Sequence, residues 1–184
     1  MVFRRSRGRA LRIVVGTYVE VRVPRRLSLR EARKATRRLL PYLIREVRKR
    51  RAVHRKALRL PTESRSAGEL RSQFSELLSG ALAGLQIGDV RVTVSERLRF
   101  AWAYADVRRR EVRVSMLCRV LPQELLWYLA VHEACHFLSP RHDGAFWQCV
   151  KRICPGYREA EELLKLYSIR VRRGGEGLWT PSRS

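Results

Sequence analysis

Residues 132–142 constrain this 184-residue chain more than any other stretch, because they hold three of its four histidines. Positions four apart lie on one face of a helix, with Cβ atoms roughly 5–6 Å from each other. His132 and His136 can therefore direct two imidazoles at one metal ion. Glu133 follows the first of them and can hold a water bound to that metal without being a ligand itself. This H-E-x-x-H spacing is typical of zinc hydrolases, with two histidine ligands and a glutamate general base.

The residues on either side of this motif predict a helix and a third ligand. Pro122 suits a first helical turn and apolar residues recur at helical spacing after it, so the helix is expected over about 122–138. Pro140 is expected to end the helix, which lets the chain turn back and offer His142 as the third ligand. A carboxylate of the last predicted helix is an alternative third ligand, and the candidates are Glu159, Glu161 and Glu162.

The cysteines bear on whether such a site is structural or catalytic. Structural zinc sites are usually four-coordinate and rich in Cys, whereas catalytic sites keep three protein ligands and one open position. None of the four cysteines forms a C-x-x-C pair, which argues against a separate zinc ribbon. A bridge between Cys149 and Cys154 is an alternative, but we expect free thiols. A helix that merely carries partly buried histidines also stays open.

The positive charge of the chain lies in its first third. The whole chain has 40 Lys and Arg against 17 Asp and Glu, a net charge of +23. Residues 1–60 hold 21 basic and 3 acidic side chains, a net of +18, whereas residues 61–184 carry a net of only +5. Such a concentration favours a polyanionic partner, most simply DNA or RNA bound through residues 1–60. A solvated basic surface is the alternative, because Arg outnumbers Lys by 35 to 5 and genome composition can produce that bias.

The apolar residues give no sign of a membrane segment. No apolar run approaches the roughly 18 residues that a transmembrane helix needs. The basic N-terminus is not followed by the apolar core of a signal peptide. We therefore expect a soluble, cytoplasmic protein with no membrane partner.

The elements expected along the chain mix strands and helices in an α+β order. Alternating apolar and polar residues mark the strands, and the capping-box pairs Ser28/Glu31 and Ser66/Glu69 mark two helix starts. In chain order we expect a β-hairpin at 11–23, a helical region at 29–58 with a kink or a second helix start at Pro41, a helix at 67–83, strands at 90–94, 99–105 and 111–115, the motif helix, and helices at 144–153 and 157–167.

Two stretches in this order of elements point to a known family, and the first of them is the more specific. One is a strand containing Trp102, followed by a proline-started helix, the H-E-x-x-H motif and the run His-Asp-Gly-Ala-Phe-Trp at 142–147. The other is the Arg-rich run at 4–10 with the hairpin that ends at 21–26. Together they resemble the YgjP-like metallopeptidase-domain family, which is related to the SprT/Spartan and WLM zincins. The resemblance covers most of residues 4–167.

The resemblance implies a small zincin-like α+β fold. An N-terminal β-hairpin and basic helices would precede a short, mostly antiparallel sheet packed on the H-E-x-x-H helix and two C-terminal helices. It further implies three histidine ligands for one Zn²⁺, with Glu133 as catalytic base and with Phe146 and Trp147 packing to fix the loop of the third ligand. These ligands are His132, His136 and His142. Where the family usually has Trp-Gly-Ser-Cys, this chain has Trp-Ala-Tyr-Ala at 102–105, with a bulky Tyr104.

The charge distribution and the order of elements divide the chain into regions. We expect a basic hairpin and helix region at 1–60 and a zincin-like catalytic region at 61–170, which form one compact unit. A flexible tail is expected at 171–184.

These features predict a zinc-dependent metallopeptidase, in which a metal-activated water attacks a peptide bond and Glu133 acts as general base. The developing oxyanion needs a donor besides the metal, and the candidates are Tyr157, Arg141 and Tyr104. The substrate is expected to be a protein or peptide, docked in extended form on the edge of the strand at 111–115. Nucleic acid bound by residues 1–60 would bring the enzyme to proteins on DNA or RNA. Two alternatives stay open, a metal-dependent hydrolase of nucleotide phosphoanhydrides and a non-catalytic nucleic-acid-binding protein with a structural metal site.

Overall fold

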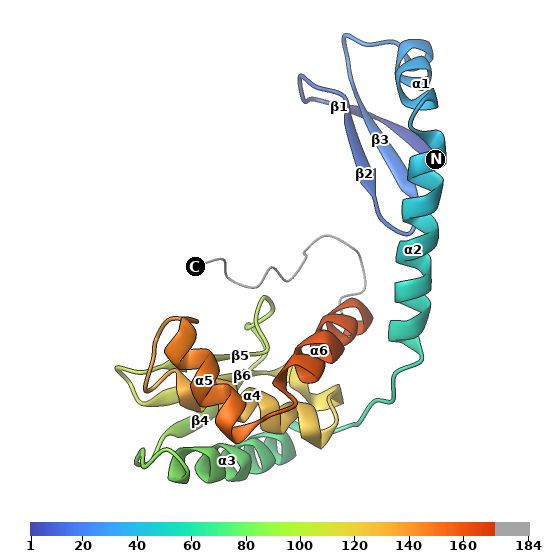
Figure 1. Ribbon diagram of the computed structural model, residues 1–184. Helices are drawn as coiled ribbons and strands as arrows, with labels where there is room; N and C mark the ends of the chain where they lie inside the picture. Colours follow the sequence, from blue (N-terminus) through green and yellow to red (C-terminus); the bar gives the residue numbers. More distant parts are fainter. Residues whose placement is uncertain (172–184) are drawn as a thin grey trace. The chain divides into compact units, whose positions relative to one another are not determined.

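The computed structural model describes residues 1–171, which belong to two compact units, Met1–Arg59 and a second unit that begins at Leu60 (Figure 1). Each unit has its own three-stranded mixed sheet and its own apolar core. The predicted α+β class is therefore confirmed. The tail predicted at 171–184 lies, from residue 172 on, outside the described residues. Among residues 1–171, no helix is both long enough and apolar enough to cross a bilayer.

The first unit has a sheet with the order β1-β3-β2, in which β1 runs parallel and β2 antiparallel to β3. The strands are β1 (Val2–Ser6), β2 (Arg12–Val15) and β3 (Val19–Pro24). Strands β2 and β3 form the predicted hairpin. Strand β1 was not predicted, because four of the first ten residues are Arg and only Phe3 of this strand packs against the core.

Two helices cover one face of this first sheet (Figure 1). Helix α1 (Leu29–Arg37) starts with the predicted capping box, in which Ser28 and Glu31 exchange main-chain and side-chain hydrogen bonds. Helix α2 (Leu40–Leu58) has Pro41 in its first turn. The interruption at Pro41 is therefore the start of a second helix, as the missing N–H of proline permits at that position.

The second unit packs its helices around a sheet with the order β4-β6-β5 (Figure 1). Its elements are α3 (Ala67–Ala83), β4 (Arg91–Ser95), β5 (Ala103–Asp106), β6 (Glu111–Ser115), a 3₁₀ helix (Met116–Val120), α4 (Gln123–Cys135), α5 (Gly144–Ile153) and α6 (Tyr157–Val171). Strand β6 is central, parallel to β4 and antiparallel to β5. The prediction of a mostly antiparallel sheet was wrong, because alternation identifies strands but does not say which strands become neighbours.

Helix α4 is the centre of the second unit's core. Its apolar residues are buried on several sides, among them Leu126, Ala130, Val131 and Ala134. They belong to the same buried cluster as residues of α3 and the inward-facing valines of β4 and β6. A helix that is apolar nearly all round is a buried core helix. The sheet and the neighbouring helices thus exclude water from the helix that carries the H-E-x-x-H motif.

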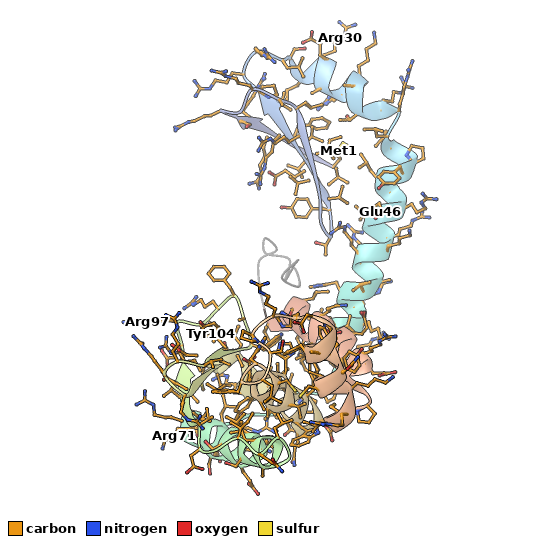
Figure 2. All side chains as sticks on the ribbon, turned by 60° about the vertical axis from the view of Figure 1, so that its left-hand side comes forward. Met1, Arg30, Glu46, Arg71, Arg97 and Tyr104 are labelled. Carbon is orange, nitrogen blue, oxygen red and sulfur yellow. The ribbon has the colours of Figure 1, made fainter. Side chains whose placement is uncertain are left out.

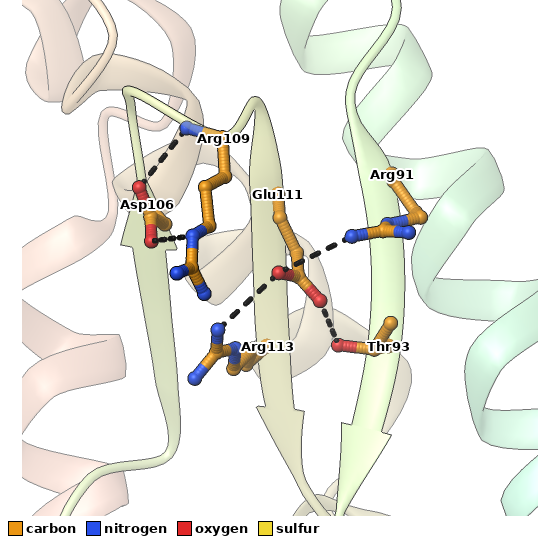
Figure 3. A network of polar contacts seen from close by, with 6 residues as sticks. All are labelled: Arg91, Thr93, Asp106, Arg109, Glu111 and Arg113. Atoms are coloured by element: carbon orange, nitrogen blue, oxygen red, sulfur yellow. Dashed lines mark hydrogen bonds and ion pairs between the residues drawn. The ribbon is translucent and has the colours of Figure 1, made fainter.

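The other face of this sheet carries a polar network around Glu111 (Figure 3). The Glu111 side chain is nearly covered, with the residue 6% exposed, and it accepts a hydrogen bond of 2.8 Å from the Thr93 hydroxyl. The guanidinium groups of Arg113 and Arg91 lie 3.4 and 3.6 Å from its second oxygen. The hydrogen bond from Thr93, and then these charges, hold the pKa of Glu111 below its ordinary value of 4.5.

This network predicts how the stability of the protein depends on pH. A carboxyl whose pKa is lowered by folding contributes stability above its unfolded pKa, and this is lost as pH falls through the folded value. Urea unfolding at pH 7, 5 and 3 should therefore show a steeper loss of stability below pH 5 for the natural protein than for Glu111→Gln. Parallel pH profiles for the two proteins would contradict this role.

Candidate metal centre

Three imidazoles from two segments of the second unit converge in one cluster. One nitrogen from each of His132, His136 and His142 lies within 4.8 Å of the other two. The Nε2 atoms of His132 and His142 are 3.0 Å apart. The ring centroids of the three histidines are separated by 4.7 to 5.0 Å. The structure thus brings together the three histidines named from the sequence.

The outer nitrogens of the two helix histidines have partners of their own. His132 Nδ1 lies 3.4 Å from the Tyr128 hydroxyl, and His136 Nδ1 lies 3.4 Å from the carbonyl oxygen of Ser139. Both distances are slightly longer than the usual range of about 2.7–3.2 Å, so these are weak contacts. In each ring an N–H at Nδ1 leaves the lone pair of Nε2 for a metal. The environment therefore favours the tautomer that a metal ligand requires.

A carboxylate lies behind Tyr128. Tyr128 is buried, and burial is the main reason why the pKa of its hydroxyl is raised. The Glu161 carboxylate of α6 raises this pKa as well, through its charge and as a hydrogen-bond acceptor. If the tyrosine donates to Glu161, its oxygen is free to accept from His132 Nδ1. The resulting chain of hydrogen bonds runs from α6 to the first ligand of α4. Sequence reasoning missed Tyr128, although its position four residues before His132 puts both on one helix face.

Two aromatic side chains of α5 support the cluster. Phe146 is fully buried, and its ring centroid lies 4.7 to 4.9 Å from those of all three histidines. The ring centroid of Trp147 lies 5.8 Å from that of His142, and the Trp147 ring stacks on Tyr157 with the two centroids 5.3 Å apart. The packing role that the resemblance implied for these two residues thus extends to all three imidazoles.

The turn between the two ligand segments is held by Asp143. Helix α4 ends at Cys135, three residues earlier than predicted. The helix thus ends before Pro140 is reached, and residues 136–141 form the reversal of the chain. Asp143 caps α5 by accepting a hydrogen bond of 3.0 Å from the Phe146 main chain, and it also accepts one of 3.1 Å from the Ser139 hydroxyl. This residue therefore ties the reversal to α5 immediately after His142. An Asp followed by a small-residue run is a helix-start signal that could have revealed it.

Glu133 lies inside the core, one residue after the first histidine of the cluster. It is 4% exposed and accepts a hydrogen bond from the Ala105 main chain of β5. Burial raises the pKa of Glu133 to about 8, against the opposing effect of that hydrogen bond. A buried carboxyl with a pKa near neutrality is typical of a general base.

Burial also keeps the imidazoles neutral. Burial and, to a lesser extent, the neighbouring imidazoles lower the pKa of His132 to about 3 and that of His136 to about 4. The pKa of His142 is lowered by burial as well. Neutral imidazole is the form that binds a metal, so the ligands need no deprotonation near neutral pH.

The donor set fits zinc. A tetrahedral ion with Zn–N bonds of about 2.0–2.1 Å places its nitrogen ligands roughly 3.3 Å apart. The observed 3.0 Å between two Nε2 atoms is close to that value. Within residues 1–171, the cluster contains three histidines and no carboxylate, so the alternative of a third ligand from Glu159, Glu161 or Glu162 has no support in this geometry. Three histidine ligands would leave a four-coordinate ion one position for a substrate or water.

The three residues considered as oxyanion stabilisers lie in different places. Tyr157 joins the cluster through its stack on Trp147, and its hydroxyl accepts a hydrogen bond of 3.2 Å from Arg158. Arg141 is exposed in the reversal before His142. Tyr104 is 53% exposed on β5 (Figure 2), in register with Arg113 on the face of the sheet opposite the core. Tyr157 is thus linked to the imidazoles through Trp147.

The cysteines of the second unit are free thiols, as predicted. The considered Cys149–Cys154 bridge is not formed. Instead the Sγ atoms of Cys135 and Cys149 lie 2.7 Å apart, where α4 and α5 touch beside the cluster.

The family comparison agrees with this geometry. A model of the YgjP-like metallopeptidase domain matches residues 66–167, which is more than half of the chain. The chain belongs to this family, and the resemblance inferred from the sequence is confirmed. Membership supports a metal-dependent hydrolase with a zinc site at the histidine cluster. The search of curated proteins gives no match. The N-terminal part of the resemblance, at residues 4–26, lies outside the matched range and stays a prediction.

Removing the hydroxyl behind His132 should weaken metal binding. Tyr128→Phe deletes one oxygen and keeps the buried ring, so folding should be nearly unchanged. Loss of such a partner typically lowers metal affinity by about 10–100-fold. Competition between the protein and a chromogenic chelator for zinc measures this affinity directly. An unchanged zinc affinity in Tyr128→Phe would show that the hydroxyl does not orient the ligand.

Removing the α5 cap should affect both stability and the metal. Loss of an N-cap typically costs about 1 kcal/mol. Asp143→Ala should show this loss and a weaker affinity for zinc, because the reversal that carries His142 loses its anchor. Ser66→Ala is the matched control, since it removes the cap of α3 far along the chain from the cluster. Equal zinc affinities of the two variants, measured with equal losses of stability, would refute the positioning role of Asp143.

Proposed function

We propose that the chain is a zinc-dependent metallopeptidase. The observation that supports this most is the convergence of three imidazoles, together with the buried carboxyl of Glu133, which follows the first of these histidines in the chain and is bonded to an outer strand of the sheet. Zinc held by these imidazoles supplies a Lewis acid that polarises a scissile carbonyl and acidifies a water. Glu133 takes a proton from the attacking water at its carboxylate oxygen. It then delivers that proton to the leaving amine.

The strand next to Glu133 favours an extended peptide as substrate. Within the described residues β5 is an edge strand, whereas the strand at 111–115, expected to dock the peptide, is the central strand β6 and has both edges paired. The Ser115 N–H donates to the Trp102 carbonyl at 2.8 Å, so the main-chain groups of Trp102 point toward β6. The main-chain groups of successive strand residues point to opposite edges, so those of Ala103 and Ala105 point to the outer edge. Ala105 uses its N–H on Glu133. A peptide paired along this edge would place its backbone beside the general base.

The side chains around the cluster would orient the ligands, exclude water and stabilise the oxyanion. Tyr128 and the Ser139 carbonyl orient the imidazoles, and Phe146 excludes water from the side of the cluster on which it packs. Tyr157 is the candidate donor to the developing oxyanion, and it would approach over Trp147. The basic first unit would bring proteins bound to DNA or RNA to this site.

Replacing the general base provides the test. Glu133→Gln should bind zinc at one ion per chain but cleave a fluorogenic peptide library about 10²–10⁴-fold more slowly, which is the usual contribution of general acid–base catalysis. Glu124→Gln makes the same change in the first turn of the same helix and should retain full activity.

Three results would contradict the proposal in different ways. Cleavage at full rate by Glu133→Gln would exclude Glu133 as the base. Turnover of a nucleoside triphosphate without peptide cleavage, lost in Glu133→Gln, would favour the phosphoanhydride hydrolase. Zinc binding without turnover of either substrate would favour a structural metal site.

A further inference from the structure

The first unit carries a row of arginines across one face of its sheet. The strand register pairs Arg4 of β1 with Arg22 of β3, and Arg12 of β2 with the same Arg22. Neighbouring strands are about 4.8 Å apart, so the three side chains start side by side. Among the described strands of this unit, no other register position aligns three positively charged residues.

The row lies on the face that the unit's helices leave open. Along β3 the residues alternate, with Val19, Val21 and Val23 buried and Glu20 and Arg22 partly exposed. Phe3 and Ile13, the partners of Val21, pack against the apolar core beneath α1 and α2. The residues in register with Arg22 must therefore point away from the helices.

One carboxylate is present on this open face. Glu20 accepts a hydrogen bond of 2.9 Å from Arg22 and lies 3.9 Å from Arg4. The hydrogen bond from Arg22 lowers the pKa of Glu20, so the carboxylate stays ionised. The other two acidic residues of the unit lie elsewhere, with Glu31 in the cap of α1 and Glu46 paired with Lys49 on α2. One negative charge thus faces three positive ones.

Two loops add further arginines at the end of the same sheet. The Arg26 guanidinium donates to the Arg9 carbonyl at 2.9 Å, and Arg5 donates to the Pro24 carbonyl at 3.3 Å. These bonds hold the loop after β1 beside the loop after β3. The exposed arginines of the two loops are Arg7, Arg9, Arg25 and Arg26. Figure 2 shows the nitrogen-tipped side chains that surround this unit.

Like charges directly opposite each other on a sheet destabilise it. A phosphate between two guanidinium groups removes this repulsion and accepts paired hydrogen bonds from their planar donors. The described strands of the first unit place no aromatic side chain on the open face, and the exposed Tyr18 lies before the start of β3, so the arginine row itself has no platform for stacking bases. The partner is then recognised through its regularly spaced phosphates and not through its sequence.

We propose that the open face of the first sheet, with Arg4, Arg12 and Arg22 at its centre, binds the phosphate backbone of a nucleic acid. Binding here is independent of the peptidase proposal, because no residue of the metal cluster takes part. An inactive Glu133→Gln chain should bind nucleic acid as the natural chain does. Failure of one proposal therefore leaves the other intact.

The test compares two triple variants of the full chain that lose the same charge from the same unit. One replaces the row, Arg4→Gln, Arg12→Gln and Arg22→Gln. The control replaces three exposed arginines of α2, Arg48→Gln, Arg50→Gln and Arg55→Gln. Binding to a fluorescein-labelled 20-base-pair DNA duplex of arbitrary sequence is followed by anisotropy between 50 and 300 mM salt.

The row variant should lose affinity by on the order of tenfold or more. The slope of log K against log salt should fall by about 0.9 for each phosphate that the variant no longer neutralises. The control should keep most of both the affinity and the slope. Thermal unfolding gives a second readout, because removing the row relieves repulsion and should raise, or leave unchanged, the Tm of the free protein. Removing the row should also abolish most of the increase in Tm that the natural protein shows when duplex is added.

Several outcomes would overturn the proposal. Equal reductions of affinity in the two variants would mean that net charge alone drives binding. Unchanged binding in the row variant would place the contact elsewhere. If polyglutamate displaced the labelled duplex as well as unlabelled duplex does, the open face would bind an acidic protein, or any polyanion, equally well.

Discussion

The burial of helix α4 is the constraint on which the rest of the second unit depends. A helix in a low-dielectric core disfavours charge on its side chains, so His132 and His136 stay neutral and the raised pKa of Glu133 makes its carboxylate a stronger base. In water the same residues would titrate near their ordinary values and would lack fixed partners. The sheet, α3 and α6 therefore do more than stabilise the fold, because they set the protonation states that metal binding and base catalysis require.

Burial alone would leave the imidazoles free to rotate, and the polar partners remove that freedom. The Tyr128 hydroxyl holds one ring, the Ser139 carbonyl holds the second, and the capped start of α5 holds the segment of the third. Phe146 packs against all three rings. The three ligands come from one helix and one turn, so a few local contacts are enough to converge them.

The sequence predicted these local features better than the pairing of distant ones. The i, i+4 spacing of His132 and His136, the capping boxes and the bounds of α3, β6 and α5 follow from short-range rules, and the structure has them. Strand β1 was missed because its pairing with β3 supplies the order that its Arg-rich sequence does not indicate. The parallel pairing of β4 with β6 was missed for a similar reason, since no local pattern encodes which strand lies next to which. Tyr128 and Glu161 act together only because α6 packs on α4, and the sequence alone does not reveal that contact.

The central claim is that three imidazole nitrogens of this chain bind one zinc ion and leave a position open. X-ray absorption at the zinc edge of the zinc-loaded protein measures the ligand atoms directly. The structure predicts three nitrogen scatterers with the ring pattern of imidazole and one oxygen, all at about 2.0–2.1 Å. A sulfur scatterer near about 2.3 Å, which Cys135 or Cys149 beside the cluster would supply, or a shell with only two imidazoles would contradict it.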